Sequence, residues 1–145
     1  MKNIVTSDRI ILISIGEVFL MKKIESANAP AALGPYSQGI IHGETVFLSG
    51  QLGIDPESGN MHDALEDQTH QIFKNIESVL KEAGATLNDI VKVTVLLADI
   101  NDFAAVNEIY GTYFEEPYPA RSAFAVKDLP AGGKIEIEVI ASLAK

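Results

Sequence analysis

An arginine and a glutamate on two predicted strands near the end of the chain could hold an organic acid with a water molecule beside it. Arg121 lies in Pro119-Ala120-Arg121-Ser122-Ala123, at the mouth of one strand, and Glu136 lies between two isoleucines on the next. A guanidinium pairs bidentately with a carboxylate, which an ammonium does not copy. A neighbouring carboxylate can orient or deprotonate water. The strand period does not separate Glu136 from Glu138, and a salt bridge explains Arg121 equally well.

Composition limits the classes of protein and partner. The chain has 145 residues, 47% of them hydrophobic, which is typical of one compact domain. Its 20 acidic and 11 basic side chains give a net charge of −9, so nucleic acid and anionic membranes are not expected partners. The absence of cysteine excludes disulfides and thiolate catalysis and agrees with a cytoplasmic location. His42, His62 and His70 form no two-ligand motif, so no metal site is expected.

The first twenty residues differ from the rest. Residues 10–15 form an apolar stretch after Lys2 and Arg9, but no signal-peptide cleavage pattern follows, and the stretch is too short to span a bilayer. Met21-Lys22-Lys23 resembles a natural start. Residues 1–20 are therefore interpreted as a translated leader, with an extra strand or a disordered arm as the alternative, and residues 21–145 as a single domain.

Hydrophobic periodicity supplies the elements that must position Arg121 and Glu136. It predicts helices over about 65–83 and 101–114. Asp63 and Glu66 suggest a capping box for the first helix, and Gly84 suggests its C-terminal cap. Runs of β-branched and apolar residues predict strands over 37–42, 45–52, 90–98, 121–126 and 134–143.

The resulting order, β-β(β)-α-β-α-β-β, predicts an α+β sandwich with two helices on one sheet face. The last strand has Ile135, Ile137 and Val139 on one face and Ile140 on the other, and with the apolar residues of the other strands this leaves more apolar sheet surface than two helices cover. Burial against other copies of the chain is the economical solution, so the sequence predicts a homo-oligomer.

Several separated motifs, taken in order from about Met21 to Lys145, resemble the RidA family of reactive intermediate deaminases, also called YjgF-like. The motifs are Gly34-Pro35-Tyr36-Ser37-Gln38-Gly39, Ser49-Gly50-Gln51, Asn101-Asp102-Phe103 with Asn107, Pro119-Ala120-Arg121-Ser122 and Ile135-Glu136-Ile137. The resemblance implies a chorismate-mutase-like fold assembled as a homotrimer with clefts between subunits. It also implies hydrolysis of 2-enamine and 2-imine acids, such as 2-aminoacrylate and 2-aminocrotonate, to 2-keto acids and ammonia without a cofactor.

The resemblance also assigns the site. It makes Arg121 the essential carboxylate anchor and selects Glu136 over Glu138 as the carboxylate that orients or deprotonates water. It implies that Tyr36, Ser49, Gly50 and Asn107 shape the substrate pocket; from their residue types alone, packing or turn roles explain them as well. The chain departs from the family where many members carry Cys or Thr, since Ala123 offers only a backbone N–H to the substrate.

Two other functions remain open from the sequence. The same cleft would suit a trimer that binds keto acids without turnover. RNA cleavage that affects translation is attached to some members of the family, but the basic surface expected for it is missing from this acidic chain.

Overall fold

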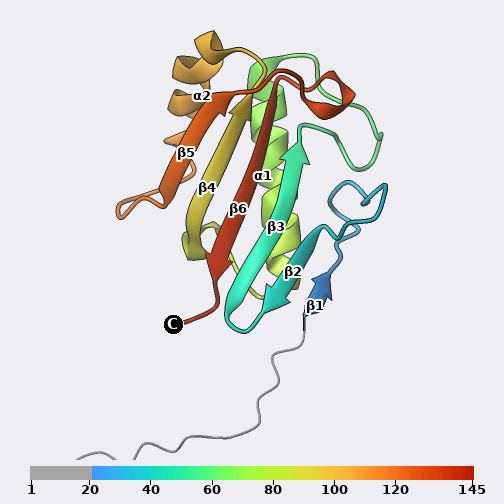
Figure 1. The fold of residues 1–145 in the computed structure, drawn as a ribbon, viewed down its shortest axis with the longest axis vertical. Helices are drawn as coiled ribbons and strands as arrows, with labels where there is room; N and C mark the ends of the chain where they lie inside the picture. The colour runs from blue at the N-terminus through green and yellow to red at the C-terminus, as the bar shows by residue number, and fades with distance from the viewer. Residues whose placement is uncertain (1–20) are drawn as a thin grey trace, which may run out of the picture.

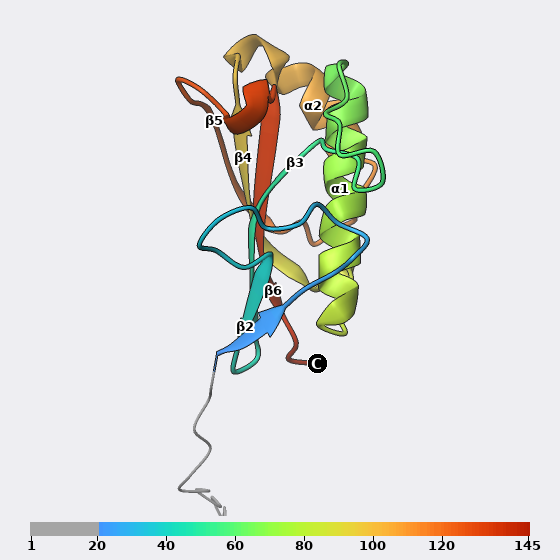
Figure 2. The same cartoon turned by 90° about the vertical axis from the view of Figure 1, so that its right-hand side faces the viewer.

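The computed structural model describes residues 21–145 as one six-stranded sheet with two α-helices on the same face (Figures 1 and 2). The sheet order is β1-β2-β3-β6-β4-β5, antiparallel except for the parallel pair β4–β5. The leader predicted for residues 1–20 lies outside the described residues. The elements are β1 (Lys22–Ile24), β2 (Gly39–His42), β3 (Thr45–Leu52), α1 (Leu65–Glu82), β4 (Ile90–Leu97), α2 (Phe103–Tyr110), β5 (Ala120–Ala125) and β6 (Ile135–Ser142), with 3-10 turns at Leu87–Asp89, Ile100–Asp102 and Pro130–Gly132.

The α+β class and the placement of both helices on one face are confirmed. Strand β1, which the sequence did not reveal, pairs with β2 and adds one edge of the sheet. Among the described residues no helix is long and apolar enough to cross a membrane.

Helix α1 begins and ends close to its predicted bounds, but the capping box is wrong. The N-cap is Ala64, which makes no side-chain cap, so Asp63 lies outside the helix and Glu66 is one residue short of the N3 position. Glu66 and Asp67 still place negative charge in the first turn, where the helix dipole favours it. Gly84 has the predicted role, because its φ of 73° lets the chain leave the helix.

Helix α2 is shorter than predicted. A 3-10 turn over Ile100–Asp102 precedes it, and the α-helix ends at Tyr110 rather than at Phe114. The N–H of Gly111 at the C-cap bonds to Asn107 O, and the Thr112 hydroxyl donates to Ile109 O. Thr112 thereby satisfies a carbonyl at the helix end, and the next residues form turns.

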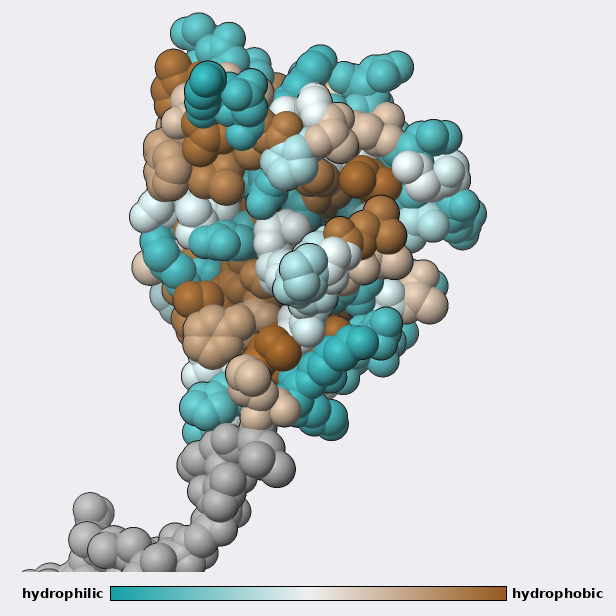
Figure 3. Space-filling view, turned by 45° about the vertical axis from the view of Figure 1, so that its right-hand side comes forward, coloured by the Kyte–Doolittle hydropathy of each residue, from teal (hydrophilic) through white to brown (hydrophobic). Residues whose placement is uncertain are grey.

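The two faces of the sheet differ in what covers them. Alternate residues of β6, from Ile135 to Ala141, are buried toward α1, while Glu136, Glu138 and Ile140 face the other way. This open face also carries Phe47, which is 44% exposed, and Figure 3 shows brown apolar surface broken by polar side chains. A shallow hollow in the open face is lined by residues of β2, β3, β4 and β6. Apolar surface therefore remains on the open face, contributed by Ile140 and Phe47, whereas Ile135, Ile137 and Val139 are buried on the helix side.

Candidate active site

Arg121 lies on edge strand β5, and its side chain extends toward α2. It pairs in register with Val93, a core residue of β4, so it points to the face that carries the helices. Its Cζ lies 4.5 Å from the ring centroid of Tyr110 and 5.6 Å from that of Phe103. These distances are typical of cation–π contacts, which orient a guanidinium without occupying its N–H donors.

The donors of Arg121 are available for a ligand. Among residues 21–145 the ion pair present is Lys23–Glu25, so the salt bridge considered for Arg121 does not form with any of these residues. A cavity of about 440 Å³ beside the guanidinium is lined by Asn107, Tyr110 and the loop that precedes β5. Burial raises the pKa of Tyr110, which therefore stays neutral, and its buried hydroxyl has no partner among the described residues.

Asn107 is exposed on α2 and lines this cavity. Ala123, two residues after Arg121, is half-buried and packs against the hydrophobic core. In this chain no side-chain polar group from position 123 reaches the cavity.

Glu136 lies on the open face of β6, where the register between β3 and β6 slips. The pairing shifts between Leu48 and Gln51, and the intervening Gly50 leaves room for the carboxylate. A Cβ at Gly50 would overlap the Glu136 carboxyl group, so a larger residue here would force the carboxylate to move from this position. Burial, and then the negative charge of Glu138, raise the pKa of Glu136. Glu136 is thus a partly desolvated carboxylate, as expected of a general base.

Tyr36 and Ser49 lie on the same side of the molecule as Glu136. The Ser49 hydroxyl donates to Ser37 O at 2.7 Å, which fixes the β3 bulge to the segment that follows Tyr36. Tyr36 is 53% exposed and, together with Gly50, lines a second cavity of about 360 Å³. Apolar residues of the loop before β2 and turn residues after β3 complete its wall.

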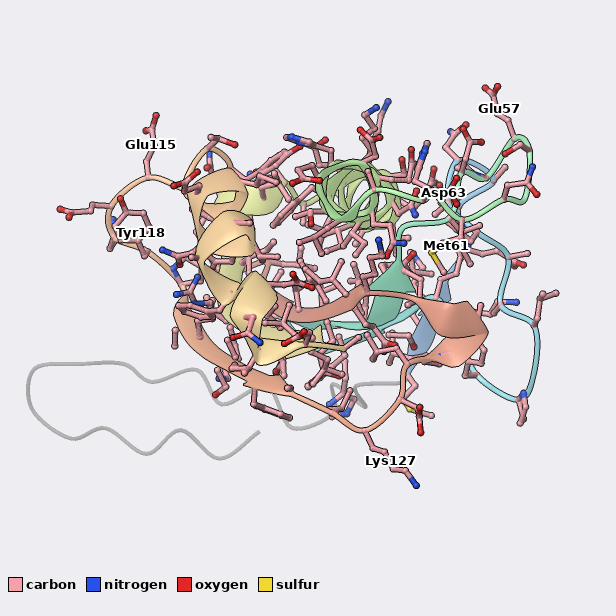
Figure 4. The ribbon with its side chains drawn as sticks, turned by 90° about the horizontal axis from the view of Figure 1, so that it is seen from above. Glu57, Met61, Asp63, Glu115, Tyr118 and Lys127 are labelled. Atoms are coloured by element: carbon pink, nitrogen blue, oxygen red, sulfur yellow. The ribbon has the colours of Figure 1, made fainter. Side chains whose placement is uncertain are left out.

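The structure thus divides the predicted site residues into two groups. Arg121 and Asn107 line the cavity by α2, whereas Tyr36, Ser49, Gly50 and Glu136 gather around the β3 bulge. Because Glu136 pairs near Leu96 on the open face and Arg121 points to the helix face, one chain does not bring the two together. Seen from above in Figure 4, Tyr118 of the first cavity and Glu57, next to the second, lie at opposite ends of the molecule.

The sequence reading missed the aromatic support of Arg121. Phe103 and Tyr110 lie within the helix predicted over about 101–114, and only the folded chain places their rings beside the guanidinium. The signal available was two aromatic residues seven apart, and it is shared by any helix packed on a core.

Comparison with known proteins gives consistent matches over most of the chain. The family model described as endoribonuclease L-PSP matches residues 26–143. The 2-iminobutanoate/2-iminopropanoate deaminase of Capra hircus is 50% identical over 119 residues, which is 81% of this chain and 87% of the relative. A crystal structure of RidA from an Antarctic Psychrobacter has a TM-score of 0.81 and 46% identity, covering 83% of this chain and 98% of that one. Escherichia coli TdcF with bound serine has a TM-score of 0.81 and 41% identity, covering 85% and 99%.

Proposed function

We propose, from the premise that the chain belongs to the endoribonuclease L-PSP family, which includes the RidA deaminases, that it hydrolyses 2-imino acids to 2-keto acids and ammonia. The observation that carries the proposal is 50% sequence identity, over most of both chains, to a 2-iminobutanoate/2-iminopropanoate deaminase. The substrates are the imine tautomers of 2-aminoacrylate and 2-aminocrotonate.

Arg121 is the proposed carboxylate anchor. Its aromatic neighbours leave the guanidinium donors free for a bidentate pair with the substrate carboxylate, and the adjacent cavity admits a small acid. Asn107 and the backbone N–H of Ala123 are proposed to contact the substrate beside it. The serine bound to Escherichia coli TdcF has the same carboxylate and a similar size, which supports this class of ligand.

Glu136 is the proposed base. It takes a proton from water as the water oxygen bonds to the imine carbon, and the C=N π electrons move to nitrogen. Protonated Glu136 then returns this proton to the nitrogen of the tetrahedral intermediate, and its carboxylate takes the hydroxyl proton as C=O forms, the C–N bond breaks and ammonia leaves. The protonated imine is already a good electrophile, so the scheme needs no cofactor. Tyr36, Ser49 and Gly50 form the proposed wall around this water.

A homotrimer with its sites between subunits is the proposed assembly. The Arg121 and Glu136 groups lie on opposite faces of one sheet, so a complete site requires Arg121 from one copy and Glu136 from another. The apolar open face supports the burial of several copies against each other. The lack of cysteine supports a cytoplasmic location for the assembly.

The test generates 2-iminobutanoate with a threonine dehydratase and follows its loss with and without the protein. We expect the protein to accelerate imine loss and ammonia release, and Arg121→Ala to abolish the acceleration. Tight binding of 2-ketobutyrate without any acceleration would instead identify a metabolite-binding protein. RNA cleavage is tested in parallel at physiological salt, where the acidic chain is expected to leave RNA intact.

A further inference from the structure

Helix α1 carries a row of amide side chains on the side that faces the sheet. Gln68, Gln71 and Asn75 are 2%, 8% and 0% exposed, and their spacing of three and four residues places them in one line. A helix face against a sheet is normally apolar, because a buried amide costs free energy unless its donors and acceptors are bonded. The partners of this row therefore indicate what it does.

Gln68 bonds to the segment that leads into β6. Its Oε1 accepts from the backbone N–H of Lys134 at 2.9 Å, and its Nε2 donates to His62 O at 2.6 Å. Lys134 is two residues before Glu136. The helix also packs closely against the residue that follows β3, since a Cβ at Gly53 would overlap the Gln68 backbone.

Asn75 bonds to the end of β3 on the other side of Glu136. Its Nδ2 donates to Leu52 O at 3.1 Å and to Ile54 O at 3.0 Å. Leu52 is the cross-strand partner of Glu136 in the β3–β6 register, directly after the bulge that contains Gly50. The helix thus holds the end of β3 and the residue that leads into β6, the two strands that meet at Glu136.

Gln71 joins the two anchors. Its Nε2 donates to Asn75 Oδ1 at 2.9 Å, and its Oε1 lies 3.3 Å from His62 Nε2. The bond to Asn75 fixes the orientation of that amide, with its donors toward the β3 carbonyls. His62 is itself tied by its backbone to Gly53 and Gln68, so the network closes on itself.

We propose that Gln68 and Asn75 are positioning residues for Glu136, which set where its carboxylate lies above Gly50. The inference rests on the proposed role of Glu136 as base. A register slip leaves the pairing near Gly50 weakly specified by the ladder alone. Two buried amides from a rigid helix supply the missing constraint, because Asn75 fixes Leu52 next to the slip and Gln68 fixes Lys134, two residues before Glu136.

The experiment replaces each amide by an apolar side chain of similar size, Gln68→Met and Asn75→Leu, in the full-length protein. Displacing a reacting group by a fraction of an ångström to 1 Å costs about tenfold to a hundredfold in rate, so we expect kcat to fall by at least about tenfold. The affinity for 2-ketobutyrate depends on the carboxylate anchor Arg121 rather than on Glu136, so it is expected to change by less than about threefold. The pKa of Glu136, read from its side-chain carboxyl carbon by NMR, is expected to shift.

Thr69→Val is the matched control. Thr69 is 0% exposed on the same helix, and its hydroxyl donates to Leu65 O within α1 rather than to the sheet. Its loss removes a buried hydrogen bond within α1 and leaves the bonds from the helix to the β3 and β6 ends in place, so kcat and the pKa of Glu136 should stay at the wild-type values. A folded Gln68→Met or Asn75→Leu variant with wild-type kcat and wild-type Glu136 titration would overturn the proposal.

Gln71→Met decides the matter if both variants unfold. It breaks the bond that orients Asn75 and leaves no backbone group unpaired, so a smaller loss of kcat and a shift of the Glu136 pKa are expected. Unchanged values for both would overturn the proposal. The NMR titration needs no turnover, so it tests positioning even if the wild-type protein hydrolyses no imine, an outcome that would reject the proposed function separately.

Discussion

The surroundings of Arg121 are not those of an ordinary surface arginine. In a chain with net charge −9 its guanidinium pairs with no carboxylate among residues 21–145, and two aromatic rings hold it instead. A cation–π contact keeps the side chain ordered while its N–H groups remain unpaired, which suits a residue that must exchange an anionic ligand.

Replacing Arg121 with lysine should weaken keto-acid binding although the charge is kept. The ammonium loses the bidentate fork and part of the aromatic contact, and hydrogen bonds to charged groups contribute about 1.5–3 kcal/mol. We expect the Kd of 2-ketobutyrate, measured by calorimetry, to rise at least about tenfold. Lys127→Ala is the control, since Lys127 projects away from the sheet after β5 (Figure 4). An equal loss in both variants would mean that only net charge matters.

The pH dependence of the reaction should follow Glu136. Its carboxylate must be ionised to accept a proton, and its pKa is raised by burial and then by Glu138, so activity should fall on acidification at a pH above the 4.5 of an ordinary glutamate. By the same shift the folded state binds this proton more tightly than the unfolded chain, so this group favours folding below that range and opposes it above.

Glu138→Gln tests the second cause of the shift. Glu138 faces the same hollow as Lys92 of β4, and removing its negative charge should lower the pKa of Glu136 and move the acid limb of kcat to lower pH. Glu44→Gln in the exposed β2–β3 turn is the control and should leave the profile in place. The idea fails if both variants, or neither, move the limb.

Among the elements, β3 matters to the site because its pairing with β6 is irregular. The slip between Leu48 and Gln51 and the lack of a side chain at Gly50 create the space that Glu136 occupies. Bulges are frequent beside active sites because they redirect a strand locally. The Ser49 hydroxyl secures this irregular stretch to the chain after Tyr36.

Gly50→Ala should therefore displace Glu136. We expect kcat to fall by up to about a hundredfold, with a loss of thermal stability from the overlap of the new methyl group with the carboxyl group. A double-mutant cycle with Glu136→Ala provides the control, because without the carboxyl group the alanine has room. The stability cost of Gly50→Ala should shrink in that background, and an unchanged cost would place the strain elsewhere.

At the scale of the whole molecule, the open sheet face and the divided site lead to the same expectation. The face exposes Phe47 beside Ile40 and Ile140, and each chain supplies Arg121 and Glu136 on opposite faces. Association would cover the apolar side chains and complete the site together, which couples activity to assembly.

Phe47→Asp should convert the assembly to monomers and abolish imine hydrolysis, because a buried unpaired carboxylate is costly at an interface. Light scattering after size-exclusion chromatography gives the mass, and the dehydratase-coupled assay gives the rate. Ser78→Asp adds the same charge on α1, away from the open face, and should keep both the mass and the rate. A wild-type protein that is monomeric at micromolar concentration would reject the assembly.

Local sequence signals determined much of the fold. The periodicity of α1, the β-branched run of β4 and the turn glycine Gly84 act over a few residues, and each predicted its element. The capping box and the end of α2 were wrong because competing local bonds, which differ by little in free energy, decide helix termini. Motif order also singled out Arg121 and Glu136 as the candidate site.

Only the tertiary structure decided how those residues are arranged. The register of β4 against β5 and β6 sets Arg121 and Glu136 on opposite faces, and no pattern along the chain encodes that pairing. The aromatic neighbours of Arg121 and the amide row of α1 likewise join segments far apart in sequence. The sequence by itself therefore identified the side chains that could act, while long-range packing and hydrogen bonding decided how those side chains are oriented.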